Sequence, residues 1–118
     1  MRRVENKVAL LTGSASGIGL STARLMAKEG AKVVIADFNL EGAQQAAEEI
    51  RTQGRTQGGE AVGIFIDAAD SKTIEEAVEF TVHHYGKINV LFNNVGLTNL
   101  QKDLDVVNID LDEWDIVY

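Results

Sequence analysis

A glycine-rich segment, Thr12 to Gly19, has the residue types and spacing that suit a phosphate group. Its glycines, Gly13, Gly17 and Gly19, are spaced G-x-x-x-G-x-G between a short apolar run and an amphipathic one. Gly13 permits a tight turn, Gly17 lets backbone approach a ligand without a Cβ in the way, and Gly19 allows a helix and a strand to pack closely. Free N–H groups and the positive dipole end of the helix then face a pyrophosphate. The alternative is a plain glycine-rich turn between a strand and a helix.

An acidic residue, Asp37, ends the second apolar run, twenty positions after Gly17. A carboxylate placed there can accept hydrogen bonds from an adenosine ribose hydroxyl, and it repels a 2′-phosphate. Ser16 stands where a basic residue would help to bind that phosphate, and no Lys or Arg follows Asp37 until Arg51. The pattern therefore favours NAD over NADP. The alternative is an Asp that only caps a helix.

The segments around these residues alternate between strand-like and helix-like patterns. Apolar runs of strand length occupy residues 7–12, 32–36, 61–66 and 88–92, with amphipathic segments at 18–28, 40–51 and from Ser71 onward. This alternation predicts an α/β fold, a Rossmann-like doubly wound parallel sheet with strand order 3-2-1-4 and the cofactor across the carboxyl ends of strands one and four. The expected apolar stripes of the three helices are Ile18, Thr22, Leu25 and Met26; Ala43, Ala46, Ala47 and Ile50; and Ile74, Ala77, Val78, Thr81 and Val82.

Three motifs, in order along the chain, resemble those of the short-chain dehydrogenase/reductase family. Residues 12–19 look like its T-G-x-x-x-G-x-G loop, Asp67-Ala68 like its adenine-contacting D-V, and Asn93-Asn94-Val95-Gly96 like its N-N-A-G. The resemblance covers Asn6 to Tyr118 and implies a nicotinamide dinucleotide cofactor. The residues expected to bind it are Gly13, Ser16, Gly17, Ile18, Gly19, Asp37, Asp67, Ala68, Asn94 and Gly96.

The resemblance also implies a division of roles among these residues. Backbone around Gly13, Ser16 and Ile18 would contact pyrophosphate and ribose, Asp37 the adenosine ribose, and residues 67–68 the adenine. Asn94 would lie near the cofactor ribose, while the preceding asparagine would brace the sheet.

No catalytic residue can be assigned from the resemblance. The family's chemistry uses a Tyr-x-x-x-Lys pair, helped by a Ser and an Asn, all downstream of the N-N-A-G strand. Tyr85 precedes that strand and is followed four residues later by Asn89, and Tyr118 is the last residue. We therefore interpret residues 1–118 as a single NAD-binding domain that lacks the C-terminal catalytic half.

Composition and charge exclude several other classes of protein. A chain of 118 residues with 45% apolar residues suits one soluble domain, and its net charge of −7 repels nucleic acid and anionic membranes. The absence of cysteine removes disulfides and thiolate metal sites, and no stretch approaches the ~20 apolar residues of a membrane span. Adjacent His83 and His84 point ~100° apart on a helix and do not form a metal site. We expect a cytoplasmic protein without a metal.

The C-terminal segment suggests assembly. Asp110 and Glu113 fit a capping box, which predicts a terminal helix that carries Trp114, Ile116 and Val117. Strand four would then be an exposed edge, and unpaired edges and apolar surfaces attract partners. We expect a homo-oligomer formed through that edge or through the terminal helix. Three hypotheses stay open: the NAD-binding portion of an oxidoreductase, a non-catalytic nucleotide-binding or assembly module, and a vestigial fragment.

Overall fold

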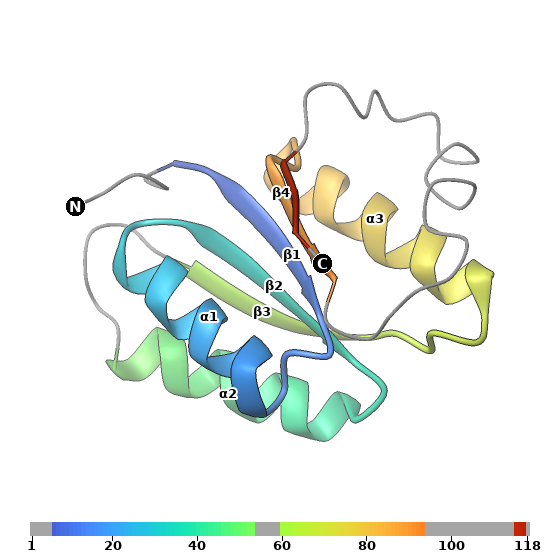
Figure 1. The fold of residues 1–118 in the computed structure, drawn as a ribbon. Helices are drawn as coiled ribbons and strands as arrows, with labels where there is room; N and C mark the ends of the chain where they lie inside the picture. Colours follow the sequence, from blue (N-terminus) through green and yellow to red (C-terminus); the bar gives the residue numbers. More distant parts are fainter. Residues whose placement is uncertain (1–5, 54–59, 94–114, 118) are drawn as a thin grey trace.

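A computed structural model of the chain describes residues 6–53, 60–93 and 115–117 (Figure 1). Strands and helices alternate along it, as the sequence predicts. The elements are β1 (Val8–Thr12), α1 (Gly17–Lys28), β2 (Lys32–Asp37), α2 (Leu40–Gln53), β3 (Glu60–Phe65), α3 (Ser71–Tyr85), β4 (Val90–Asn93) and β5 (Asp115–Val117).

The strands form one parallel sheet with the order β3-β2-β1-β4-β5. The predicted order 3-2-1-4 is therefore confirmed for the first four strands. β1 is central among them: Leu10 lies opposite Val34 of β2 on one side and opposite Leu91 of β4 on the other. Because the strands are parallel, the turns that follow them all leave the sheet at the same edge.

Helices cover both faces of this sheet. In Figure 1, α1 and α2 lie on one face and α3 lies on the other. Leu11 and Ile35 belong to the core beneath α1 and α2, whereas Leu10 and Val34 belong to the core beneath α3. Continuous apolar runs, rather than alternating ones, are what a strand buried on both faces requires. All five residues of β1 are buried accordingly.

The buried face predicted for α2 is confirmed, and so is that of α3, although its Val82 is only partly buried. Of the stripe predicted for α1, only Met26 packs, partly buried, against the core, and the fully buried face is a different one. α1 places Gly19, Ala23 and Ala27 against the sheet. Ile18 and Leu25 lie at its flank and are 73% and 60% exposed. Small side chains let the helix lie close to the strands, and the bulkier apolar residues are displaced to its side. The buried residues of the other two helices are Ala43, Ala46, Ala47 and Ile50 in α2 and Ile74, Ala77, Val78 and Thr81 in α3.

The terminal helix predicted from the capping box is wrong for the part that the structure describes. Residues 115–117 form strand β5, which runs parallel to β4 and places Ile116 opposite Leu91. β4 is therefore not an exposed edge, contrary to the sequence-based expectation. Two physical reasons favour the strand: Ile116 and Val117 are β-branched, and the unpaired backbone groups of β4 offer a ladder to complete. Residues 110–114 lie outside the described residues.

Tyr85 lies at the amino-terminal edge of the sheet, opposite the turns that follow the strands. It ends α3, and the Nζ of Lys32, the first residue of β2, is 5.8 Å from its ring centroid. Its ring also meets that of His84 edge-on at 4.5 Å. Burial raises the pKa of the Tyr85 hydroxyl, the nearby Glu60 carboxylate raises it further, and the Arg51 guanidinium opposes them.

The raised pKa of Tyr85 makes the stability of the fold sensitive to alkaline pH. The unfolded chain ionises this tyrosine near pH 10.0, before the folded chain does, so the free energy of unfolding falls as pH rises beyond that point. We predict that Tyr85→Phe removes this loss: its stability relative to the wild type is constant below about pH 9 and improves above about pH 10. Urea unfolding followed by circular dichroism measures the difference. Parallel pH profiles for the two proteins would contradict the prediction.

Candidate functional site

The glycine-rich loop follows the central strand and is bonded to its neighbours on both sides. The Gly13 N–H donates to the carbonyl of Ala36 at 2.8 Å, and the Ser14 hydroxyl, fully buried, donates to the carbonyl of Leu11 at 2.7 Å. At the base of the loop, the Thr12 hydroxyl donates to Oδ1 of Asn93 at 3.2 Å. β2 and β4 therefore both fix the place where the chain leaves β1.

The amino terminus of α1 has neither a side-chain cap nor an acidic residue. The N-cap residue, Ser16, makes no side-chain cap hydrogen bond, and the first turn carries no acidic residue. The first N–H groups of a helix have no partner within it, so here they are left for an external acceptor. Ser16, Gly17 and Ile18 are all exposed. Gly17 has a φ of 62° and open space where a Cβ would stand, which suits the close approach of a ligand to the backbone.

Gly19 fixes how close the helix lies to the loop. A Cβ at this position would stand 2.6 Å from the carbonyl oxygen of Gly13 and 2.8 Å from the Cα of Ser14. Both of these are backbone atoms, which cannot turn aside as a flexible side chain can. The predicted role of this glycine, close packing, therefore has a specific steric origin in the loop.

Asp37, at the carboxyl end of β2, lies beside this loop. Its Oδ2 accepts a hydrogen bond from the N–H of Ala15 at 3.0 Å, and its Oδ1 accepts one from the N–H of Asn39 at 3.0 Å. The side chain is half-buried. Each carboxylate oxygen has a second lone pair, so the group can still accept hydrogen bonds from ligand hydroxyls. The structure thus brings Asp37 and the glycine loop together, as the sequence predicts.

Asp67 and Ala68 begin the turn between β3 and α3. Oδ1 of Asp67 accepts from the N–H of Ala69 at 2.9 Å, and the Thr73 hydroxyl accepts from the N–H of Asp67 at 2.9 Å. The following helix begins at Ser71, and its N-cap is Asp70, whose side chain accepts a hydrogen bond from the N–H of Lys72. Ala68 is exposed at the same edge of the sheet as the glycine loop.

Part of the predicted site lies outside the described residues. Asn94 and Gly96 belong to that part. The preceding residue, Asn93, is described: it is buried, and it binds the Thr12 hydroxyl through Oδ1. This contact agrees with the bracing role that the resemblance implied for it.

Sequence reasoning missed an aromatic pair beside Asp37. Phe38 directly follows Asp37, and Phe65 of β3 is the register partner of Asp37. The two rings are tilted with centroids 5.7 Å apart, and the side chains are 70% and 41% exposed. The signal was present in the sequence, since Phe38 is a large aromatic residue placed after the end of a strand. Neither Ala15 nor Asn39, which bind the Asp37 carboxylate, could be identified by residue type, because both use their backbone.

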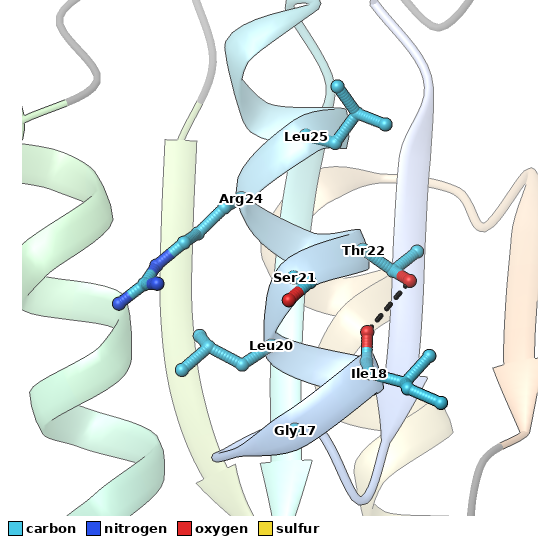
Figure 2. Close-up of a pocket in the computed structure, with 7 residues that line it drawn as sticks. All are labelled: Gly17, Ile18, Leu20, Ser21, Thr22, Arg24 and Leu25. Atoms are coloured by element: carbon cyan, nitrogen blue, oxygen red, sulfur yellow. Dashed lines mark hydrogen bonds between the residues drawn. The ribbon is translucent and has the colours of Figure 1, made fainter.

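An open groove runs along the flank of α1 (Figure 2). Ile18, Thr22 and Leu25 project to one side of the helix, and Arg24 projects to the other, toward α2, where it pairs with Glu49 at 2.9 Å. The groove shares Gly17 and Ile18 with the candidate site, but neither Asp37 nor Asp67 lines it. The groove is therefore separate from the two aspartates, and both apolar and polar side chains line it.

Comparison with known proteins identifies the arrangement. A family model described as short chain dehydrogenase matches residues 7–118. The chain belongs to the short-chain dehydrogenase family. Members of this family are oxidoreductases that use nicotinamide dinucleotide cofactors. Within the described residues, no helix is long and apolar enough to cross a membrane, and no cluster of side chains could hold a metal ion.

Similar proteins are dehydrogenases and reductases more than twice as long. The chain is 42% identical to the 7alpha-hydroxysteroid dehydrogenase of Bacteroides fragilis over 115 residues, which is 98% of this chain and 43% of that one. It is 38% identical to the 3-oxoacyl-[acyl-carrier-protein] reductase of Thermotoga maritima, covering 98% and 44%. A short chain dehydrogenase structure from Mycobacterium smegmatis matches with a TM-score of 0.75 and 31% identity, covering 82% and 40%. The hydroxysteroid dehydrogenase structure from Escherichia coli matches with a TM-score of 0.72 and 32% identity, covering 80% and 37%.

The contact of Gly19 with the loop predicts that this position tolerates no side chain. Gly19→Ala should lower the free energy of unfolding by about 1–3 kcal/mol, because the added methyl group meets backbone that cannot move without distorting the loop. Ser21→Ala is the control, since Ser21 is exposed on the same helix and its substitution should change stability by less than about 0.5 kcal/mol. Urea unfolding measures both variants. Equal stabilities would show that the loop adjusts freely.

Proposed function

We propose that this chain is the NAD-binding portion of a short-chain dehydrogenase, and that it prefers NAD(H) to NADP(H). The observation that carries the proposal is the uncapped start of α1 beside a half-buried carboxylate. The helix start supplies N–H donors and a positive dipole end for a pyrophosphate, while Asp37 supplies acceptors for ribose hydroxyls. The two are joined by one hydrogen bond, so they lie within reach of a single dinucleotide.

The surroundings of Asp37 support a nucleoside without a 2′-phosphate. The negative carboxylate repels such a phosphate, and the loop of residues 12–19 contains no Lys or Arg, with Ser16 where a basic residue would help to bind it. Phe38 and Phe65 offer an exposed apolar surface next to Asp37, suited to one face of an adenine ring. Asp67 and Ala68, on the next turn, are proposed to line its edge. Asn94 and Gly96 complete the proposed set.

Hydride transfer is proposed to need residues that this sequence does not contain. No tyrosine in the chain is followed four positions later by lysine. Tyr85, the one tyrosine in the described residues, lies at the opposite edge of the sheet from the glycine loop. We therefore propose that residues 1–118 act as one cofactor-binding domain in the cytoplasm, and we assign no substrate.

Cofactor preference is tested by calorimetric titration of the purified chain with NADH and with NADPH. We predict saturable binding of NADH and binding of NADPH weaker by about tenfold or more, because the 2′-phosphate would face the Asp37 carboxylate. Asp37→Ala should weaken NADH binding by about tenfold, the value of a charge-assisted hydrogen bond.

Either of two results would count against this function. A chain that is folded by circular dichroism but binds neither dinucleotide would favour an assembly module or a vestigial fragment. Equal affinity for NADH and NADPH would leave dinucleotide binding in place and remove the proposed preference.

A homo-oligomer is the second proposal, favoured by the apolar flank of α1. Ile18 and Leu25 are the most exposed of the large apolar side chains on this helix, and both line the groove of Figure 2. Val90 and Phe92 of β4 face the same side of the sheet, where Phe92 is only partly buried. Exposed large apolar side chains of this kind are typical of an interface. The proposed contact is therefore this flank, since β5 covers the β4 edge that the sequence suggested.

Leu25→Lys tests this interface without touching the proposed cofactor residues. Light scattering at micromolar concentration should give the wild type a mass of two or more chains and the variant the mass of one, because a lysine ammonium cannot be buried without a partner. Leu25→Met keeps the apolar surface and should leave the assembly intact. A wild-type chain that is already monomeric would rule out the interface.

A further inference from the structure

Asp37 is the side chain through which β2 holds the middle of the glycine loop. Its Oδ2 binds the N–H of Ala15, a residue 22 positions earlier, while its Oδ1 binds the N–H of Asn39 in the turn that leads to α2. One carboxylate therefore connects the β1–α1 turn with the β2–α2 turn. Both contacts are made by the protein to itself and need no ligand.

The other described contacts of the loop hold its beginning rather than its middle. Gly13 is bonded to Ala36 at the edge of the sheet, and the Ser14 hydroxyl is bonded three residues back, to Leu11. After Ala15, the Ser16 side chain makes no cap hydrogen bond, and residues 16–18 are exposed. Among the residues that the structure describes, the bond from Ala15 to Asp37 is thus the last one from another element before α1 begins.

We infer that Asp37 is a positioning residue for the pyrophosphate site as well as a ribose ligand. By accepting the Ala15 N–H, it sets the direction in which the chain enters α1, and so the direction of the first N–H groups of the helix. Those groups bind an anion well only if they are held in place before it arrives. This inference rests on the proposed binding of NAD(H), and it extends the role of Asp37 from the ribose to the phosphates.

The two roles of Asp37 predict different behaviour toward a dinucleotide without adenosine ribose hydroxyls. If Asp37 acted only through those hydroxyls, a reduced dinucleotide with a 2′,3′-dideoxyadenosine moiety would bind wild type and Asp37→Ala equally. Loss of the negative charge near the phosphates would even favour the variant. The positioning role predicts the opposite: Asp37→Ala binds this analogue more weakly than the wild type does, by about fivefold to tenfold.

Two further variants separate positioning from charge. Asp37→Asn retains a side-chain oxygen that can accept the Ala15 N–H, so it should recover most of the affinity for the dideoxy analogue. Glu41→Ala removes one negative charge from the exposed first turn of α2 and should leave the affinity unchanged. Loss of affinity in Glu41→Ala as large as in Asp37→Ala would show that the effect does not depend on the bond to Ala15 and would overturn the inference.

Amide hydrogen exchange in the ligand-free chain tests the same bond without a cofactor. We expect the Ala15 N–H to be protected in the wild type, to exchange at least tenfold faster in Asp37→Ala, and to recover protection in Asp37→Asn. The Leu10 amide, in the central strand, should stay protected in all three and shows that the variants are folded. Unchanged exchange at Ala15 in Asp37→Ala would overturn the inference. Protection lost as expected, with no binding of NADH by the wild type, would instead reject the proposed function and keep the structural bond.

Discussion

Pairing of β1 on both sides is the constraint on which the rest of the structure depends. The backbone of such a strand makes its hydrogen bonds to two neighbouring strands, and helices cover both of its faces, so its side chains are shielded from water. Its residues must be apolar until the chain leaves the sheet, and Thr12, the first polar one, is satisfied by Asn93 of β4. Because the end of β1 is fixed by both neighbours, the backbone N–H groups of the following turn also have a fixed position. The proposed anion site depends on that position.

The candidate site combines parts that are weak alone. A helix that begins without a side-chain cap leaves donors unused, and a half-buried carboxylate that already binds backbone N–H groups keeps lone pairs for further donors. In this chain the two lie next to each other, with an aromatic pair at their side. In the proposed function, the pyrophosphate, the ribose diol and the adenine ring of one dinucleotide would meet these three features.

Much of this could be predicted from the sequence, because it depends on patterns along one element. Uninterrupted apolar runs identified the first four strands, and the order of those strands follows from short connections with a fixed handedness. The stripe of α1 could not be predicted in the same way: Ile18 and Leu25 satisfy the helical period, but Gly19, Ala23 and Ala27 allow a closer approach to the sheet. The strand at 115–117 was not predicted because the capping pattern depends only on neighbouring residues. Strand formation there depends instead on pairing with β4, which lies much earlier in the sequence. The bond from Ala15 to Asp37 involves a backbone group, which no side-chain motif reports.

The fifth strand has a consequence for how the molecule behaves in concentrated solution. An open edge on a flat parallel sheet is a template on which further chains can add, and growth of that kind ends in fibres. Here β4 is covered by a strand of only three residues that begins with an aspartate. A strand of three residues offers an incoming strand few backbone hydrogen bonds. The aspartate at its start and the chain's net charge of −7 also repel a second copy of the chain. Among the described residues, β5 therefore covers the edge of β4 and offers an added chain little to pair with.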